Sequence, residues 1–184
     1  MTLQSQSLLD SLAQLTKKHI RFAETLLPLP ETALAQRPAA GGWNALECLE
    51  HLNRYSSYYL DALQSCISKA ASLPAATYRP GRLGNYFAKI IHPDTSRKKM
   101  KTPQPMNALH ASLNRSVVTT FIDNQRQLLQ LLEQARKVDL GKEKTGTSLS
   151  KLIRLKLGDT LRFVIYHNER HIRQAENVTG GTKV

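Results

Sequence analysis

The chain has 184 residues, of which 41% are hydrophobic and 22% are charged, and its formal net charge at pH 7 is +12. This length fits one domain, over residues 1–184, and the balance of residue types excludes a wholly disordered chain. The first residues lack the basic start and continuous apolar run of a signal peptide, and no apolar run is long enough to cross a bilayer. We therefore expect a cytoplasmic protein without membrane contacts.

Apolar residues recur every three or four positions and predict four long helices, at about residues 3–27, 44–70, 109–137 and 159–178. The start of the second helix is well marked, because Asn44 can cap it and Glu47 stands three residues later, as in a capping box. We find no alternation that predicts a strand, and the basic stretch at residues 149–158 is taken as part of a connection. The predicted fold class is therefore all-α, a four-helix bundle with a long crossover between helices two and three.

That crossover is a long basic connection, residues 68–107. It contains five prolines, and residues 83–91 within it are expected to form a short helix. Between Ser72 and Asn107 it carries seven basic residues against one acidic residue, which is half of the net charge. We expect this part to be the least regular and most mobile of the chain, with early protease cleavage at Arg97–Lys101.

Three histidines have the spacing and position of metal ligands. His167 and His171 lie one turn apart at the margin of the apolar stripe of the last helix, and His51 lies on the inward face of the second helix. Two imidazoles four residues apart can chelate one ion, and a third from a neighbouring helix leaves a coordination position open. Imidazole accepts zinc, nickel, cobalt, iron and copper. The alternative for each ring is an ordinary hydrogen-bonded histidine of the core or of a cleft.

The sequences WNALECLEHL at residues 43–52 and LGDTLRFVIYHNERHIRQ at residues 157–174 resemble the DinB/YfiT-like superfamily of metalloenzymes. The resemblance implies an up-down-down-up four-helix bundle over nearly the whole chain and frequently a homodimer. It also implies a divalent metal ion, zinc or nickel first, held by His51, His167 and His171. Trp43 and Gln174 match positions that are commonly filled in the same way, which suggests supporting roles.

Other residues are candidates for supporting the metal ligands. Glu47 can orient His51 through the second ring nitrogen, although its capping role competes with this. Gln174 is one turn from His171 on the last helix. His19 falls in the apolar stripe of the first helix and is a candidate fourth ligand or partner of a ligand. A buried neutral core histidine is the preferred interpretation of His19.

Four further residues are candidates for binding substrate. Tyr55 and Tyr58 share the inward face of the second helix and can line a pocket, although tyrosines at helical spacing are usually packed in the core. Arg54 and Arg170, on the flanks of the second and fourth helices, can select a thiol that carries a carboxylate, although exposed arginines usually serve only solubility.

The resemblance implies an enzyme in which the ion activates a bound nucleophile. We favour a thiol-dependent S-transferase that acts on small electrophilic molecules and uses a low-molecular-weight thiol as cosubstrate. A metal-dependent hydrolase is the alternative. A non-enzymatic module that binds nucleic acid or an acidic partner through the basic segment 78–101 is another possibility, since aromatic residues are interleaved with its charges. A bundle whose site has no catalytic use is a further alternative. For that segment we prefer solvated surface charge to nucleic-acid binding.

Overall fold

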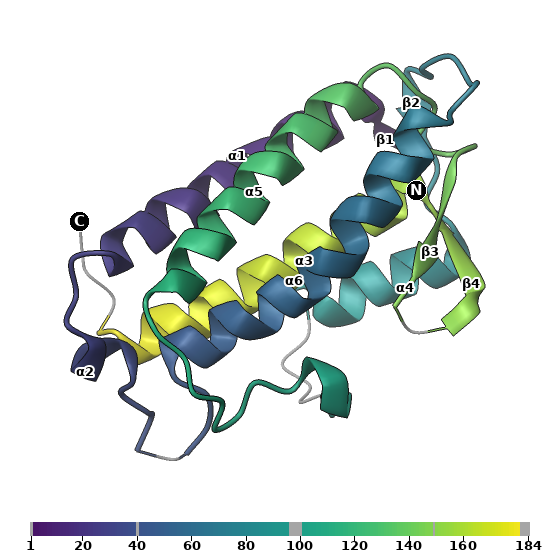
Figure 1. The fold of residues 1–184 in the computed structure, drawn as a ribbon. Coiled ribbons are helices and arrows are strands. Elements are labelled where there is room, and N and C mark those ends of the chain that lie inside the picture. The colour runs from purple at the N-terminus through teal and green to yellow at the C-terminus, as the bar shows by residue number, and fades with distance from the viewer. Residues whose placement is uncertain (1, 40, 96–100, 149, 181–184) are drawn as a thin grey trace.

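The computed structural model describes residues 2–39, 41–95, 101–148 and 150–180, and it is mostly helical, as predicted (Figure 1). Its long helices are α1 (Ser5–Leu26), α3 (Ala45–Ser68), α5 (Ser116–Ala135) and α6 (Leu157–Val178). Shorter helices lie in the connections: α2 (Glu31–Leu34), α4 (Arg82–Ile91) and a 3-10 helix, Gln104–Met106. α1 packs against α5 and α6, and α3 packs against the same two helices. Their apolar stripes meet in a shared interior.

Two small antiparallel sheets accompany the helices, so the prediction of a chain without strands was wrong. The paired strands are β1 (Leu3–Gln4) with β2 (Thr77–Tyr78) and β3 (Lys144–Thr147) with β4 (Ser150–Lys156). In β4 the side chain of Leu155 is buried whereas those of Leu152 and Arg154 are exposed. Buried and exposed side chains therefore do alternate along β4. This alternation covers only one short strand directly before a helix, and such a short pattern is equally compatible with a helix.

The third long helix begins later than predicted. α5 starts at Ser116, whereas the apolar spacing predicted a start near residue 109. His110 has a positive φ of 61°, and the Asn114 side chain accepts a hydrogen bond from the backbone N–H of Ser116 at 2.9 Å. Both features oppose a regular helix, because an L-residue rarely adopts positive φ and a local side-chain bond competes with the helical ladder. The connection is longer as a result, and its last part passes along α3.

The first half of this connection is folded against α6, in contrast to the irregular segment that we expected. Its predicted short helix is present as α4, which packs on α6. Asp159 of α6 is completely buried and accepts hydrogen bonds from the Tyr78 hydroxyl and from the Gly81 N–H, the latter at 2.8 Å. These bonds anchor the chain on both sides of residues 79–80 and bring α4 beside the histidine-bearing helix.

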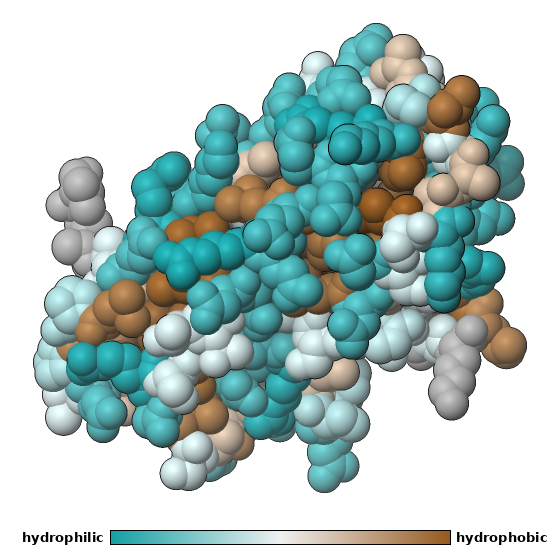
Figure 2. Space-filling model, turned by 45° about the horizontal axis from the view of Figure 1, so that its top comes forward, coloured by the Kyte–Doolittle hydropathy of each residue, from teal (hydrophilic) through white to brown (hydrophobic). Residues whose placement is uncertain are grey.

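Hydrophilic residues cover most of the face seen in Figure 2, with hydrophobic residues in narrow strips between them. Within the described ranges, no helix is both long enough and apolar enough to span a membrane. The cleavage site predicted at Arg97–Lys101 lies outside the described residues except for Lys101, which is exposed. Early cleavage there stays a prediction.

Replacing Gly84 by alanine should detach α4 from α6. A Cβ at this position would overlap the Asp159 side chain and lie only 2.5 Å from its Oδ2. We expect G84A to lower the unfolding free energy by about 1–3 kcal/mol, although alanine ordinarily stabilises a helix relative to glycine. Lys89 is exposed on the same helix, so K89A should change stability by less than about 0.5 kcal/mol. Urea denaturation followed by circular dichroism measures both, and a G84A protein of wild-type stability would contradict the tight packing.

Candidate metal centre and adjoining cavity

Three histidines converge between α3 and α6. His51 on α3 and His167 on α6 face each other, with their Nε2 atoms 3.1 Å apart. His171, one turn further along α6, has its ring centre 4.6 Å from that of His51 and 4.9 Å from that of His167. One nitrogen from each ring can be chosen so that the three lie within 4.8 Å of one another. The structure thus brings together the three histidines that the sequence singled out, in a group that could hold a metal ion.

Neighbouring oxygen atoms determine which nitrogen carries the proton in two of these rings. The Nδ1 of His51 lies 2.7 Å from the carbonyl oxygen of Met106, and the Nδ1 of His171 lies 3.1 Å from the Oε1 of Gln174. Both oxygens accept, so each Nδ1 donates and the Nε2 of a neutral ring keeps its lone pair. Outer hydrogen bonds of this kind are usual for metal-bound histidine. The donor set therefore fits a divalent ion.

Burial keeps the three rings neutral. It lowers the pKa of His51 from 6.5 to about 4 and that of His171 to about 3, and it lowers the pKa of His167 well below 6.5. His51 and His167 are only 2% and 6% exposed, so a charged ring would lose most of its hydration. Neutral imidazole is also the form that binds a metal, so the environment keeps these rings in a form that could bind one.

A cavity of about 740 Å³ adjoins the histidines. Besides them, its lining includes four aromatic rings and two cationic side chains: Trp43, Tyr55, Phe87, Phe163, Lys101 and Arg170. The described residues that line it include no aspartate or glutamate. Because Lys101 is exposed and Phe163 is buried, the cavity leads from the surface to the interior. Its volume is in the usual range for sites that bind small molecules.

One stripe of α3 holds the backbone of the segment that returns to α5. Glu47, His51 and Arg54 are four and three residues apart, so they lie on one face of the helix. Each bonds one backbone group: Glu47 accepts from the His110 N–H (2.6 Å), His51 donates to the Met106 carbonyl (2.7 Å) and Arg54 donates to the Asn107 carbonyl (2.7 Å). The same segment supplies part of the cavity wall, so the stripe shapes the cavity.

These contacts correct the role predicted for Glu47. Its carboxylate completes the capping box with Asn44 and lies 2.5 Å from the Arg37 guanidinium, and neither oxygen bonds His51. Burial alone would raise the pKa of Glu47, but the bonds from Arg37 and from backbone N–H groups lower it. The carboxylate is therefore ionised, and its hydrogen bonds all lie at the start of α3. The Met106 carbonyl, and not Glu47, accepts the hydrogen bond from His51 Nδ1.

Arg54 and Tyr58, both predicted to bind substrate, do not line the cavity. Arg54 is used by its backbone partners in the returning segment and by the neighbouring Glu50, 2.9 Å away. Tyr58 is 38% exposed and packs edge-on against Tyr59. Tyr55 and Arg170 were predicted for the same role, and both do line the cavity.

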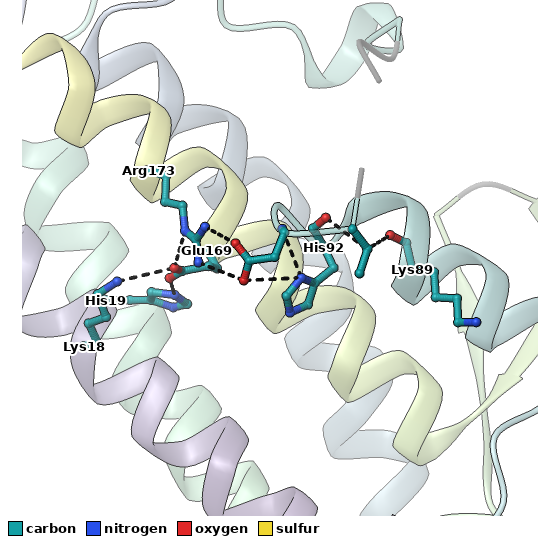
Figure 3. A network of polar contacts seen from close by, with 8 residues as sticks. Lys18, His19, Lys89, His92, Glu169 and Arg173 are labelled. Carbon is teal, nitrogen blue, oxygen red and sulfur yellow. Dashed lines mark hydrogen bonds and ion pairs between the residues drawn. The ribbon is translucent and has the colours of Figure 1, made fainter. Parts of the chain in front are cut away.

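His19 takes part in a different network, on the side of α6 that faces α1 (Figure 3). It is completely buried, and its Nε2 lies 3.0 Å from the Oε2 of Glu169. Lys18 and Arg173 also pair with Glu169, at 3.3 and 2.6 Å. Burial lowers the pKa of His19, in agreement with the preferred interpretation of a neutral core histidine. Because Glu169 stands between the two histidines of α6, the network fixes the turn that carries them.

The residues of this region that sequence reasoning missed include Lys101, Met106, Phe87 and Phe163. Met106 acts through its backbone carbonyl, which every residue has, so no sequence signal could have marked it. Phe163 stands one turn before His167 on the same side of α6, and that spacing could have singled it out. Phe87 and Lys101 belong to the connection, whose path depends on contacts between distant segments.

The sequence profile of the DinB superfamily matches residues 14–175, a range that covers most of the chain and includes all three histidines. The chain has no significant match among curated proteins or among solved structures. The fold and the histidine group described above agree with the profile match.

The metal-free protein should lose stability as the pH falls from 7 to 5. In the unfolded chain the histidines take up protons below about pH 6.5, whereas the buried rings stay neutral, so protonation favours unfolding. For one such histidine the loss is on the order of 2 kcal/mol over this range. Urea denaturation at pH 7, 6 and 5 measures it. H171N removes one of the three rings and should show a shallower decline, and equal slopes for both proteins would contradict the explanation.

Proposed function

The chain belongs to the DinB superfamily, and from its converging histidines we propose that it is an enzyme that binds one divalent metal ion at His51, His167 and His171. Zinc and nickel are the first candidates because both accept imidazole nitrogen. The observation that carries the proposal is the pair of facing Nε2 atoms, 3.1 Å apart, in two rings that burial keeps neutral. Since the Met106 carbonyl holds the Nδ1 proton of His51, this ring offers a lone pair that a cation would satisfy.

A divalent ion with three protein ligands keeps an open position, and when bound it lowers the pKa of a thiol or water beside it. The chain itself supplies the placement. Met106 and Gln174 fix two of the rings, and Trp43 stacks on His171 with a ring-centre distance of 5.5 Å. These contacts leave the histidines open toward the cavity, where a substrate would lie.

We propose S-transfer from a low-molecular-weight thiol to a small electrophile as the reaction. The thiol would lose its proton to solvent, and its sulfur would form a bond to an electrophilic carbon. One existing bond of that carbon would break at the same time, to a halide, to the ring oxygen of an epoxide or within the π system of a quinone. Its electron pair would leave with the halide or stay on the oxygen, which then takes up a proton. The cavity supports S-transfer over hydrolysis, because its described lining includes no carboxylate that could act as a general base for water. A thiol depends less on such a base, since its ordinary pKa of about 8.5 is far below that of water. A metal-dependent hydrolase is the alternative.

A binding function for the basic segment 78–101 has less support. Stacking on nucleic-acid bases requires accessible aromatic rings. Tyr78 is only 1% exposed and Phe87 lines the cavity, so of the three aromatic residues in the segment only Tyr86 is well exposed, at 57%. Solvated charge is the better explanation of the basic residues described in this segment.

Family membership also supports three proposals about organisation. The four long helices would run up-down-down-up, residues 1–184 would form one domain, and the protein would act as a homodimer. That it is cytoplasmic is a separate proposal, which rests on the apolar pattern of the sequence. Sedimentation at micromolar concentration tests the homodimer, because a monomer would exclude it.

Replacing His171 by alanine should strongly weaken metal binding and leave the helical content nearly unchanged, because this ring is a partly exposed side chain at the edge of the core. Isothermal titration with Zn²⁺ or Ni²⁺, on tag-free protein stripped of metal, should give one ion per chain for the wild type. We expect H171A to bind at least about 100-fold more weakly, a larger loss than removing an outer hydrogen-bond partner usually causes. His110 is exposed and outside the group, so H110A is the control. Equal affinities for H171A and wild type would exclude this site.

The metal-loaded protein should consume a low-molecular-weight thiol when an electrophile is present. Loss of free thiol, followed with Ellman's reagent against a panel of epoxides, quinones and activated aryl halides, measures the reaction, and H171A should be inactive. If the loaded protein leaves thiols untouched and instead hydrolyses esters or amides, water is the nucleophile and the hydrolase alternative is correct.

A further inference from the structure

Aromatic rings form a continuous wall along the cavity. Six lining residues contact one another in this order: Trp43, His51, Tyr55, His167, Phe163 and Phe87. The distances between successive ring centres run from 4.7 to 6.3 Å. Rings at such distances make favourable offset or edge-on contacts, and a planar molecule laid against the wall would extend the same pattern. The wall therefore suits a ligand with a flat apolar body.

The charged side chains in the described lining of the cavity are all positive. Arg170 comes from α6, between the two histidines of that helix, and Lys101 comes from the connection. The described lining contains no acidic residue. An arginine fork matches the two oxygens of a carboxylate, and in a partly enclosed site such a pair is stronger than in open water. The cations therefore suit an anionic group near the mouth of the cavity.

We propose that this cavity binds a small molecule with a planar aromatic body and one carboxylate end, the body against the aromatic wall and the carboxylate between Arg170 and Lys101. The volume of about 740 Å³ accommodates such a molecule beside the histidines. The inference rests on the proposed function only in that the molecule would be the substrate of the same site. The predicted binding uses side chains of the wall and the mouth, so it does not require a metal.

Trp43 is the single tryptophan of the chain and lines the cavity, so its fluorescence reports what binds there. The full-length protein, as purified and after chelation of metals, is titrated with 3-phenylpropanoate, 3-phenylpropanamide and 3-cyclohexylpropanoate. We expect saturable quenching by 3-phenylpropanoate in both preparations. The amide, which lacks the charge, and the cyclohexyl acid, which lacks the planar ring, should each bind about tenfold more weakly.

Variants separate the contributions of the two cations. R170Q and K101Q should each weaken binding of 3-phenylpropanoate several-fold and leave binding of the amide unchanged. Lys142 is an exposed lysine outside the cavity, so K142Q, which removes the same charge, should have no effect. Circular dichroism melts verify that the variants are folded. Should R170Q fail to fold, K101Q alone decides the result.

Three outcomes would overturn the inference: equal affinity for acid and amide, equal affinity for the phenyl and cyclohexyl acids, or no saturable binding of any probe at millimolar concentration. Failure here is distinguishable from failure of the proposed function. If metal titration shows the His171-dependent ion while no probe binds, the metal site stands and the ligand class is wrong. If the probes bind as expected and no metal binds, the ligand class stands and the metal site is wrong.

Discussion

The candidate site depends on the backbone of residues 105–110 being held against one stripe of α3. A connection that crosses a helical surface must pair its N–H and C=O groups, because leaving them unpaired away from water is costly. Glu47, His51 and Arg54 meet this need for three of them. For His51 the bond also sets the orientation of the ring: with Nδ1 bonded to the Met106 carbonyl, Nε2 faces His167. The hydrogen bond between His51 and Met106 thus both holds the connection against α3 and orients the His51 ring.

α6 is positioned from several directions by buried polar groups, and this gives its two histidines a rigid base. Near its start Asp159 binds the Tyr78 hydroxyl and the Gly81 N–H, which anchors the connection. Ten residues further along α6, Glu169 binds His19 of α1. The histidines use the remaining side of the helix, toward α3 and the cavity. Side chains on packed helices keep their geometry better than side chains on loops, which would suit the proposed metal site.

The parts of this arrangement that follow from local sequence could be predicted, and the parts that follow from long-range backbone contacts could not. The helical period placed His51, His167 and His171 on inward faces, and Asn44 and Glu47 marked the start of α3. The partner of His51 is a backbone carbonyl 55 residues away, for which no residue type is diagnostic. The β3–β4 hairpin and the late start of α5 were missed because short strands and single backbone irregularities leave weak periodic signals.

Charge balance links the metal proposal to the ligand proposal. A divalent ion at the histidines would place two positive charges in a largely buried position, and neutral imidazoles do not offset them. Three buried acids on the same helices are already paired: Glu47 with Arg37, Asp159 with Arg162, and Glu169 with Lys18 and Arg173. The balancing charge would then come from molecules bound in the cavity, as a deprotonated thiol and a carboxylate. A cavity with cations and no acid in its described lining favours partners that arrive as anions and disfavours cationic substrates.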